Sequence, residues 1–130
     1  MKRTAYGQPV TAAESSPATP TKSNLKLITE IRAGQEGSEW LDEVVFQEVG
    51  TTNASAYLLV FVEDPKSKVL TLAGVELSNG GTLAYRKVRV AIREYYEGGW
   101  KVYAGSSAAH TVGWLPKAIL GDRRSDFESA

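Results

Sequence analysis

Apolar and polar residues alternate most regularly in the second half of the chain, between Thr82 and Tyr103. Three apolar residues there alternate with three basic ones, in the order Lys87, Val88, Arg89, Val90, Ile92 and Arg93. This is the period-two pattern of a half-buried β-strand. Glu97-Gly98-Gly99 supplies turn residues, and a second strand begins at Trp100. The pattern predicts a β-hairpin with one apolar face and one basic face that also carries tyrosine.

Four further strands are predicted, over Leu25–Ile31, Tyr57–Val62, Val69–Leu77 and Thr111–Leu115. Tyr57–Val62 is a continuous apolar run, typical of a central strand buried on both faces. Gly74 indicates a bulge, and Pro116 is expected to end the last strand before one turn of helix. Asn79-Gly80-Gly81 predicts a second hairpin, since Asn and Gly tolerate positive φ.

The stretch Ser38–Gly50 is ambiguous between helix and strand. Its apolar residues fall at i, i+1, i+4, i+5 and i+9, namely Trp40, Leu41, Val44, Val45 and Val49. That spacing places them on one face of a helix, for which Ser38 could be the N-cap. Against this, the run VVFQEV is also plausible as a strand. We favour a short helix over residues 39–49 and keep the strand as the alternative.

Taken together, these elements predict a mostly β domain over residues 25–120. We expect an antiparallel β-barrel or sandwich of about six strands with at most one short helix, an α+β variant included. Residues 1–24 are rich in Ala, Thr, Ser and Pro, so they predict either a floppy tail or an extended N-terminal arm. The arm would order on a neighbouring subunit through Tyr6, Pro9 and Val10. Residues 121–130 predict a charged C-terminal tail.

Composition narrows the function classes. The 130 residues include fifteen basic and fifteen acidic side chains, one histidine and no cysteine. The absence of cysteine excludes disulfides, thiolate metal sites and cysteine nucleophiles. Zero net charge disfavours a dedicated duplex-DNA binder. No apolar run approaches the eighteen or so residues of a membrane span, and no apolar stretch follows Met1-Lys2-Arg3 as in a signal peptide. We therefore expect a cytoplasmic or virion protein.

Catalytic chemistry would have to centre on His110. Ser106 and Ser107 are near it in sequence, but no G-x-S-x-G elbow is present. A single imidazole without thiols does not make a typical zinc site, and there is no phosphate-binding or dinucleotide motif. We therefore predict a loop histidine, no metal, no cofactor, no small-molecule substrate and no enzymatic activity.

The basic strand suggests a nucleic-acid face. Lys87, Arg89, Arg93 and Tyr95, together with Tyr85, would share one side of the hairpin, and cations interleaved with aromatic rings are typical of single-strand binding. The alternative is an exposed sheet face whose charges are paired by Glu63, Asp64 or Glu76 on neighbouring strands.

Lys87–Glu97, KVRVAIREYYE, resembles the central strand of the positive-coactivator family of single-stranded DNA-binding proteins. The resemblance implies that Arg89 and Arg93 contact the sugar-phosphate backbone. It covers eleven residues and no more. The Lys/Gly-rich segment of that family is replaced by AGSSAAHTVGW, and no long C-terminal dimerisation helix fits before Ala130. We therefore do not assign the chain to the family.

These observations favour a non-enzymatic assembly protein that acts through protein–protein contacts. The combination of a β domain, an arm and zero net charge is typical in style of phage virion parts such as decoration or head–tail connector proteins. Its partners would be copies of itself or a neighbouring assembly component, and its oligomer would weaken when residues 1–22 are deleted. The alternative is a single-stranded nucleic-acid-binding protein that uses the basic face of residues 82–103.

Overall fold

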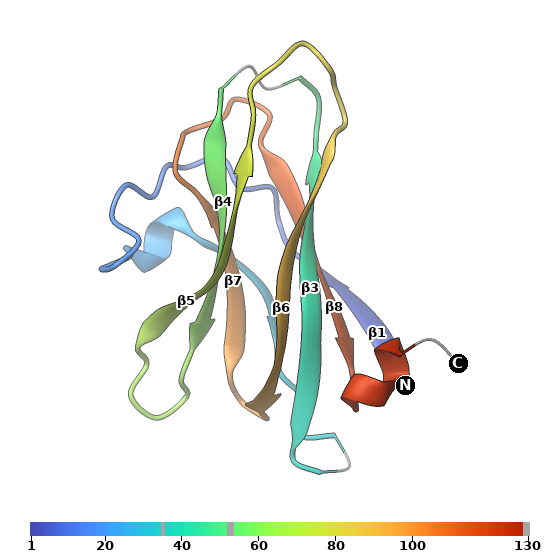
Figure 1. The fold of residues 1–130 in the computed structure, drawn as a ribbon. Coiled ribbons are helices and arrows are strands. Elements are labelled where there is room, and N and C mark those ends of the chain that lie inside the picture. Colours follow the sequence, from blue (N-terminus) through green and yellow to red (C-terminus); the bar gives the residue numbers. More distant parts are fainter. Residues whose placement is uncertain (35, 52–53, 129–130) are drawn as a thin grey trace.

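A computed structural model describes residues 1–34, 36–51 and 54–128, which form two four-stranded antiparallel sheets (Figure 1). Sheet A has the strand order β1 (Lys2–Tyr6), β8 (Trp114–Gly121), β3 (Ser38–Glu48) and β6 (Lys87–Glu97). Sheet B has the order β2 (Lys26–Glu30), β7 (Lys101–Ser106), β4 (Ala56–Glu63) and β5 (Leu70–Ser78). The described helical elements are the short 3-10 helices η1 (Lys22–Asn24) and η2 (Arg124–Phe127). The prediction of a mostly β fold is confirmed; the sheets form a sandwich and do not close into a barrel.

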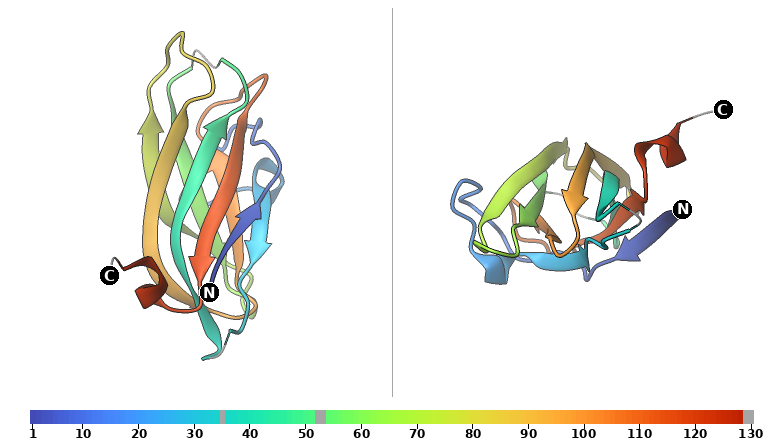
Figure 2. Two further views of the ribbon diagram at one scale, coloured as in Figure 1. Left: turned by 90° about the vertical axis from the view of Figure 1, so that its right-hand side faces the viewer. Right: turned by 90° about the horizontal axis from the view of Figure 1, so that it is seen from below.

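The strand pairings follow a single rule. β1 pairs with β8, β2 with β7, β3 with β6 and β4 with β5, so the chain is one long antiparallel ribbon. The ribbon is rolled so that successive pairs alternate between the two sheets, which face each other in Figure 2. Two four-stranded sheets connected in this way form a jelly roll. Most connections therefore cross from one sheet to the other.

This topology overturns the predicted hairpin over Thr82–Tyr103. The two strands exist, but β6 pairs with β3 in sheet A and β7 pairs with β2 and β4 in sheet B. Likewise, residues 79–86 lead from β5 in sheet B to β6 in sheet A. Glycine turns of this kind reverse the chain whether or not the flanking strands bond to each other. The turn predicted at Gly98-Gly99 is confirmed, with Gly99 at a φ of 99°. The tight turn predicted at Asn79-Gly80-Gly81 is wrong, because these residues lie in the longer connection 79–86 and none of the three has a positive φ.

The favoured helix over residues 39–49 is also wrong, because Ser38–Glu48 is strand β3. It lies between β8 and β6, and Val44, Val45 and Phe46 are all buried, at 0, 1 and 0% exposure. A strand covered on both faces has no need to alternate, so its apolar residues can fall by chance at helical spacing. Its two consecutive valines and its phenylalanine suit a strand.

The predicted end of the last strand at Pro116, with a helical turn after it, is wrong as well. Pro116 lies inside β8, paired with Phe46 on one side. On its other side, its carbonyl oxygen accepts a hydrogen bond from the Gly7 amide at 2.9 Å. The imide nitrogen faces the same side as this carbonyl, where β1 has already ended at Tyr6, so no ladder hydrogen bond is lost.

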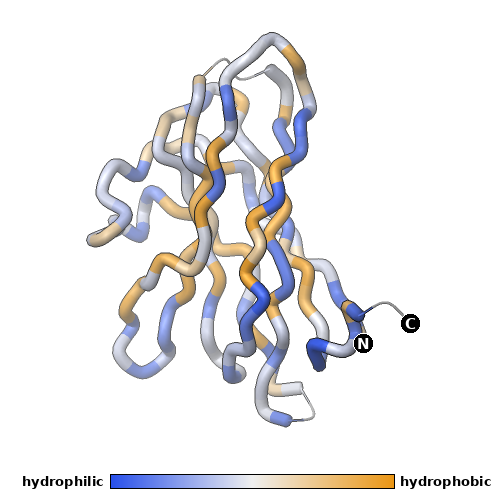
Figure 3. Tube along the Cα trace, viewed as in Figure 1, coloured by the Kyte–Doolittle hydropathy of each residue, from blue (hydrophilic) through white to orange (hydrophobic). Residues whose placement is uncertain are grey.

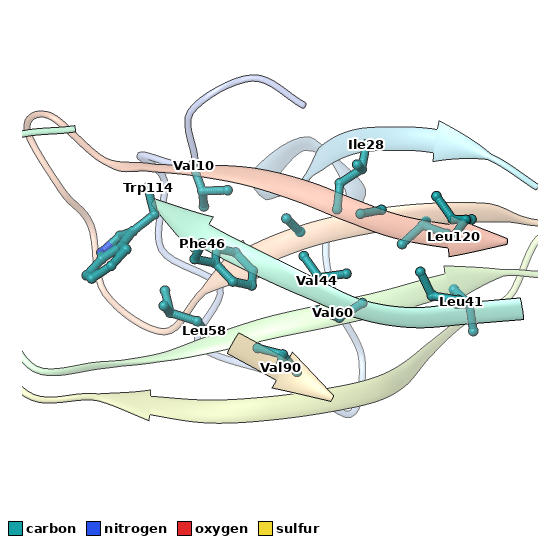
Figure 4. Packing of buried hydrophobic residues seen from close by; sticks show 14 of the residues in the cluster. Val10, Ile28, Leu41, Val44, Phe46, Leu58, Val60, Val90, Trp114 and Leu120 are labelled. Carbon is teal, nitrogen blue, oxygen red and sulfur yellow. The ribbon is translucent and has the colours of Figure 1, made fainter. Parts of the chain in front are cut away.

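The inner faces of the two sheets form one core, shown from close by in Figure 4. β4 is buried on both faces over residues 58–62, as predicted, whereas Tyr57 at the start of the predicted run is 52% exposed. A register irregularity also occurs beside Gly74, as predicted: Val60 pairs with Gly74 and Phe61 with Leu72. A Cβ on Gly74 would lie 2.6 Å from Ile92 Cδ1 and 2.8 Å from Val90 Cγ1. The missing side chain therefore lets β5 approach β6 closely.

In the described part of the chain, no helix is long and apolar enough to cross a bilayer.

Candidate interaction surfaces

The N-terminal segment is folded onto its own domain, in contrast to the extended arm predicted for residues 1–24. β1 pairs with β8 from Lys2 opposite Gly121 to Tyr6 opposite Lys117. Of the three predicted anchors, Val10 is fully buried and exchanges two backbone hydrogen bonds with Trp114, at 2.7 and 3.2 Å. Pro9 is half-buried, and Tyr6 is 65% exposed. Val10 therefore completes the core of its own chain, and Tyr6 alone among the three presents most of its side chain to solvent.

Residues 11–25 continue across the outer face of sheet B, in blue in Figure 1. The buried carboxylate of Glu14 organises this segment, because it accepts hydrogen bonds from Ser16 N, Thr21 N and Asn24 Nδ2. Burial acts to raise the pKa of Glu14, but these hydrogen bonds outweigh it and lower the pKa below its ordinary value. The segment has few apolar residues, and the hydrogen bonds to the Glu14 carboxylate hold it in place.

The predicted basic residues lie on the outer face of sheet A. Val88 and Val90 point to the core, so Lys87 and Arg89 point outward, and both are exposed. Arg93 occupies a β-bulge opposite residues 41–43, with φ of 54°. Figure 3 shows hydrophilic and hydrophobic residues alternating along β6.

Arg89 is paired, though by a different acid from those anticipated. Its Nη1 lies 2.5 Å from Glu43 Oε1 on β3. Glu63 and Glu76 belong to sheet B, and Glu63 pairs with Lys22 at 2.7 Å. The expected partners were wrong because they were chosen on the assumption that β6 lies beside β4 and β5. Arg89 remains 63% exposed in its side chain.

Tyr95 is held in a different way from the other predicted residues of this face. Its ring packs edge-on against Trp40 at 4.9 Å between centroids. Its hydroxyl accepts a hydrogen bond from the Arg124 amide at 2.8 Å. Tyr95 therefore anchors the C-terminal segment onto sheet A and is not a free ring.

The C-terminal segment, predicted as a charged tail, covers one end of the same face. The Phe127 ring lies over Gly121, where a Cβ would approach Phe127 Cε2 to 2.6 Å. The N-terminal ammonium binds Asp122 and Asp126 at 3.0 and 2.9 Å, and these hydrogen bonds raise its pKa. A hollow of about 280 Å³ remains between this segment and sheet A, lined by Trp40, Asp42, Arg93, Arg124, Phe127 and Glu128.

Pairing of β1 with β8 adds Tyr6 and Lys117, neither of which the sequence had placed on this face. Tyr6 lies opposite Lys117, Lys117 opposite Val45, and Val45 opposite Arg89. These four residues form one cross-strand row on the outer face of sheet A. We call this surface the cationic face and define it by Lys87, Arg89, Arg93, Lys117 and Tyr6. No local signal could have joined Tyr6 to Arg89, because they are 83 positions apart in the chain.

A second open surface lies on the outer face of sheet B. Tyr57 pairs with Leu77, Leu59 with Val75, and Phe61 with Leu72, so all six share one side of the sheet. Residues 11–25 cover Leu59 and Phe61, but Tyr57, Leu72, Val75 and Leu77 stay 40–52% exposed. We call these four residues the apolar face. Sequence reasoning missed it because β5 reads equally well as a strand with two covered faces.

The histidine and its neighbouring serine do come together. Ser106 Oγ lies 2.8 Å from His110 Nε2, but Ser106 is fully buried and His110 is 8% exposed. In this arrangement the serine hydroxyl cannot reach a substrate in solution. Among the described residues, no group of three or more His, Asp or Glu side chains is placed to hold a metal ion. The contact is best explained as a hydrogen bond that satisfies two buried polar groups.

Acidification below about pH 6.5 is expected to destabilise the domain through His110. Burial lowers the pKa of His110, and the charge of Glu48 only partly opposes this. Between the ordinary pKa and the lowered one, the unfolded chain binds a proton that the folded chain does not. The free energy of unfolding should therefore fall as the pH falls, by up to about 1.4 kcal/mol per pH unit, and level off above about pH 6.5.

Urea unfolding of the wild type and of His110→Gln at several pH values between about 5 and 7.5 measures this. The wild type should lose stability over that window and the variant should lose less. Equal pH dependence in the two proteins would contradict the assignment.

No protein-family model matches this chain, and no curated protein matches its sequence. The cationic face and the apolar face are therefore the features from which its function can be argued.

Proposed function

We propose that this protein is a non-enzymatic assembly protein and that it associates with a second copy of itself through the apolar face. The observation that carries the proposal is the exposure of Tyr57, Leu72, Val75 and Leu77 on one side of sheet B. Contiguous exposed apolar surface rimmed by polar residues is characteristic of protein–protein contact sites.

Charge favours a second copy as the occupant. None of the four side chains is charged, so two identical apolar faces can meet about a two-fold axis without repulsion. The cationic face cannot meet its own copy in this way, because arginine would face arginine. A jelly roll is also a scaffold on which capsid and lectin domains are built, although the fold alone does not select a function. A phage virion as the setting stays a prediction.

The oligomeric state and its dependence on the apolar face test this proposal. Val75→Lys combined with Leu77→Lys places two cations per chain at the two-fold contact and should weaken the dimer at least tenfold, or about 1.4 kcal/mol. The matched control is Leu83→Lys combined with Val112→Lys, because these residues are 72 and 39% exposed outside the apolar face. Sedimentation velocity over a concentration series measures the association.

Wild type and control should both self-associate, and the face variant should be monomeric. A monomeric wild type at every concentration would exclude the proposed dimer. A face variant that associates as tightly as the control would show that copies meet elsewhere.

A further inference from the structure

The cationic face is the second open surface, and it lies on the opposite side of the sandwich from the apolar face. Figure 2 (left) shows β6, β3, β8 and β1 side by side, with the C-terminal segment over one end only. Along β6 the cations Lys87, Arg89 and Arg93 follow one another, and Lys117 stands two strands away. Acids share this side as well. Glu43 binds Arg89, and Asp42 accepts a hydrogen bond from Trp40 Nε1. Glu97 alternates with Tyr95 at the end of β6, and Glu128 lines the hollow beside Arg93.

The spacing of the cations suits an extended phosphate backbone. Alternate residues of a strand are about 6.8 Å apart, which is comparable with the distance between consecutive phosphates in a nucleic-acid strand. Lys87 and Arg89 are alternate residues, and the bulge brings Arg93 to the same side beside the hollow lined by Trp40 and Arg124. Guanidinium groups bind phosphate oxygens through paired N–H donors.

Two exposed tyrosines favour an unpaired strand over a duplex. Tyr6, in the row that contains Arg89, is 65% exposed, and Tyr85, two residues before Lys87, is 68% exposed. A ring in solvent can stack on a base only when that base is free of a duplex, and single-strand binders combine such rings with a cationic track. Outside the end covered by the C-terminal segment, the exposed side chains of β6 and β1 on this face are accessible to splayed bases.

From this geometry we infer that the cationic face binds single-stranded nucleic acid. Lys87, Arg89 and Arg93 contact phosphates, and Tyr6 stacks on a base. The net charge of the whole chain is zero, so attraction at long range is weak and binding depends on these local contacts. This inference is independent of the proposed dimer, because the two faces are on opposite sheets.

Fluorescence anisotropy with a labelled oligothymidylate, over a salt series, measures the interaction. Three phosphate contacts predict a slope of log K against log salt near −2, since each single-strand contact contributes about −0.7. Lys87→Gln, Arg89→Gln and Arg93→Gln together should abolish most of the affinity and of the slope. The matched control removes three cations elsewhere, by Lys26→Gln, Lys66→Gln and Lys68→Gln, and should bind as the wild type does.

Two further measurements distinguish binding of a single strand from binding of any polyanion. A duplex of the same length should bind at least tenfold more weakly. Tyr6→Ala should weaken single-strand binding about tenfold while leaving the salt slope unchanged. The inference is overturned by no binding at low salt, by equal losses in the control, by equal affinity for duplex or heparin, or by a Tyr6→Ala protein that binds normally.

Discussion

Deletion of residues 2–10 is expected to unfold the domain. The deletion removes β1, exposes the edge of β8 and takes Val10 out of the core. It also removes Arg3, whose Nε and Nη2 bind the two carboxylate oxygens of Glu39 at 2.8 and 2.7 Å. Glu39 is 2% exposed, and loss of one partner of a buried ion pair costs about 3–5 kcal/mol by itself. Together these losses approach the whole stability of a typical domain, about 5–15 kcal/mol.

The loss should appear as the absence of a cooperative thermal transition in circular dichroism. Two point variants separate folding from partner binding, because both residues were predicted to be anchors of a free arm. Val10→Asp should be severely destabilised by a buried charge, whereas Tyr6→Asp should change the free energy of unfolding by less than about 1 kcal/mol. A truncated protein that unfolds cooperatively with the native spectrum would restore the free-arm interpretation.

Arg86→Ala is expected to destabilise the domain by about 3–5 kcal/mol. Arg86 directly precedes β6, and its Nε and Nη2 bind the fully buried carboxylate of Glu48 at 3.1 and 2.8 Å. The guanidinium also lies over the Trp114 ring, 5.5 Å from its centroid, and donates to the Asn79 carbonyl. Glu48 in turn raises the pKa of Arg86. Removal of this side chain therefore affects a buried charge, a core ring and the connection between β5 and β6 at once.

Arg89→Ala is the matched control for this variant. It removes the same side chain three residues further along, where the ion pair with Glu43 is largely exposed. Exposed pairs contribute about 0–1 kcal/mol, so the two variants should differ by several kcal/mol in urea unfolding. Similar losses would mean that burial of Glu48 does not govern the strength of its pair. The double variant Glu48→Leu with Arg86→Leu should recover part of the loss, because no charge is then buried.

Local pattern predicted most of the strands because strand periodicity depends on nearest neighbours. β4 was recognised as a buried central strand from its continuous apolar run, and β5 together with the irregularity at Gly74 was recognised from composition. The pattern failed for β3, where burial on both faces hides the alternation that identifies a strand. It failed for Pro116 because the tolerance of a strand for proline depends on where the neighbouring strand ends.

Of the two candidate surfaces, the sequence predicted only the residues that lie on a single strand, β6. Lys87, Arg89 and Arg93 could be placed together because they belong to β6, whereas Tyr6 and Lys117 could not be added to them. Their association depends on pairing between the two ends of the chain. The apolar face could not be separated from the core for a similar reason: the exposure of Leu72, Val75 and Leu77 depends on how far residues 11–25 reach across sheet B.

The amino-acid sequence by itself determined the class of fold, the turn at Gly98-Gly99 and the alternation of apolar and basic residues along β6. These properties depend on backbone preferences and on side chains a few residues apart. Only the tertiary structure decided which strands pair, that residues 1–10 belong to the core sandwich, and which apolar side chains stay in water. Each of these follows from hydrogen bonds and burial between segments far apart in the chain, whose free energy is collective and leaves no mark on any short stretch.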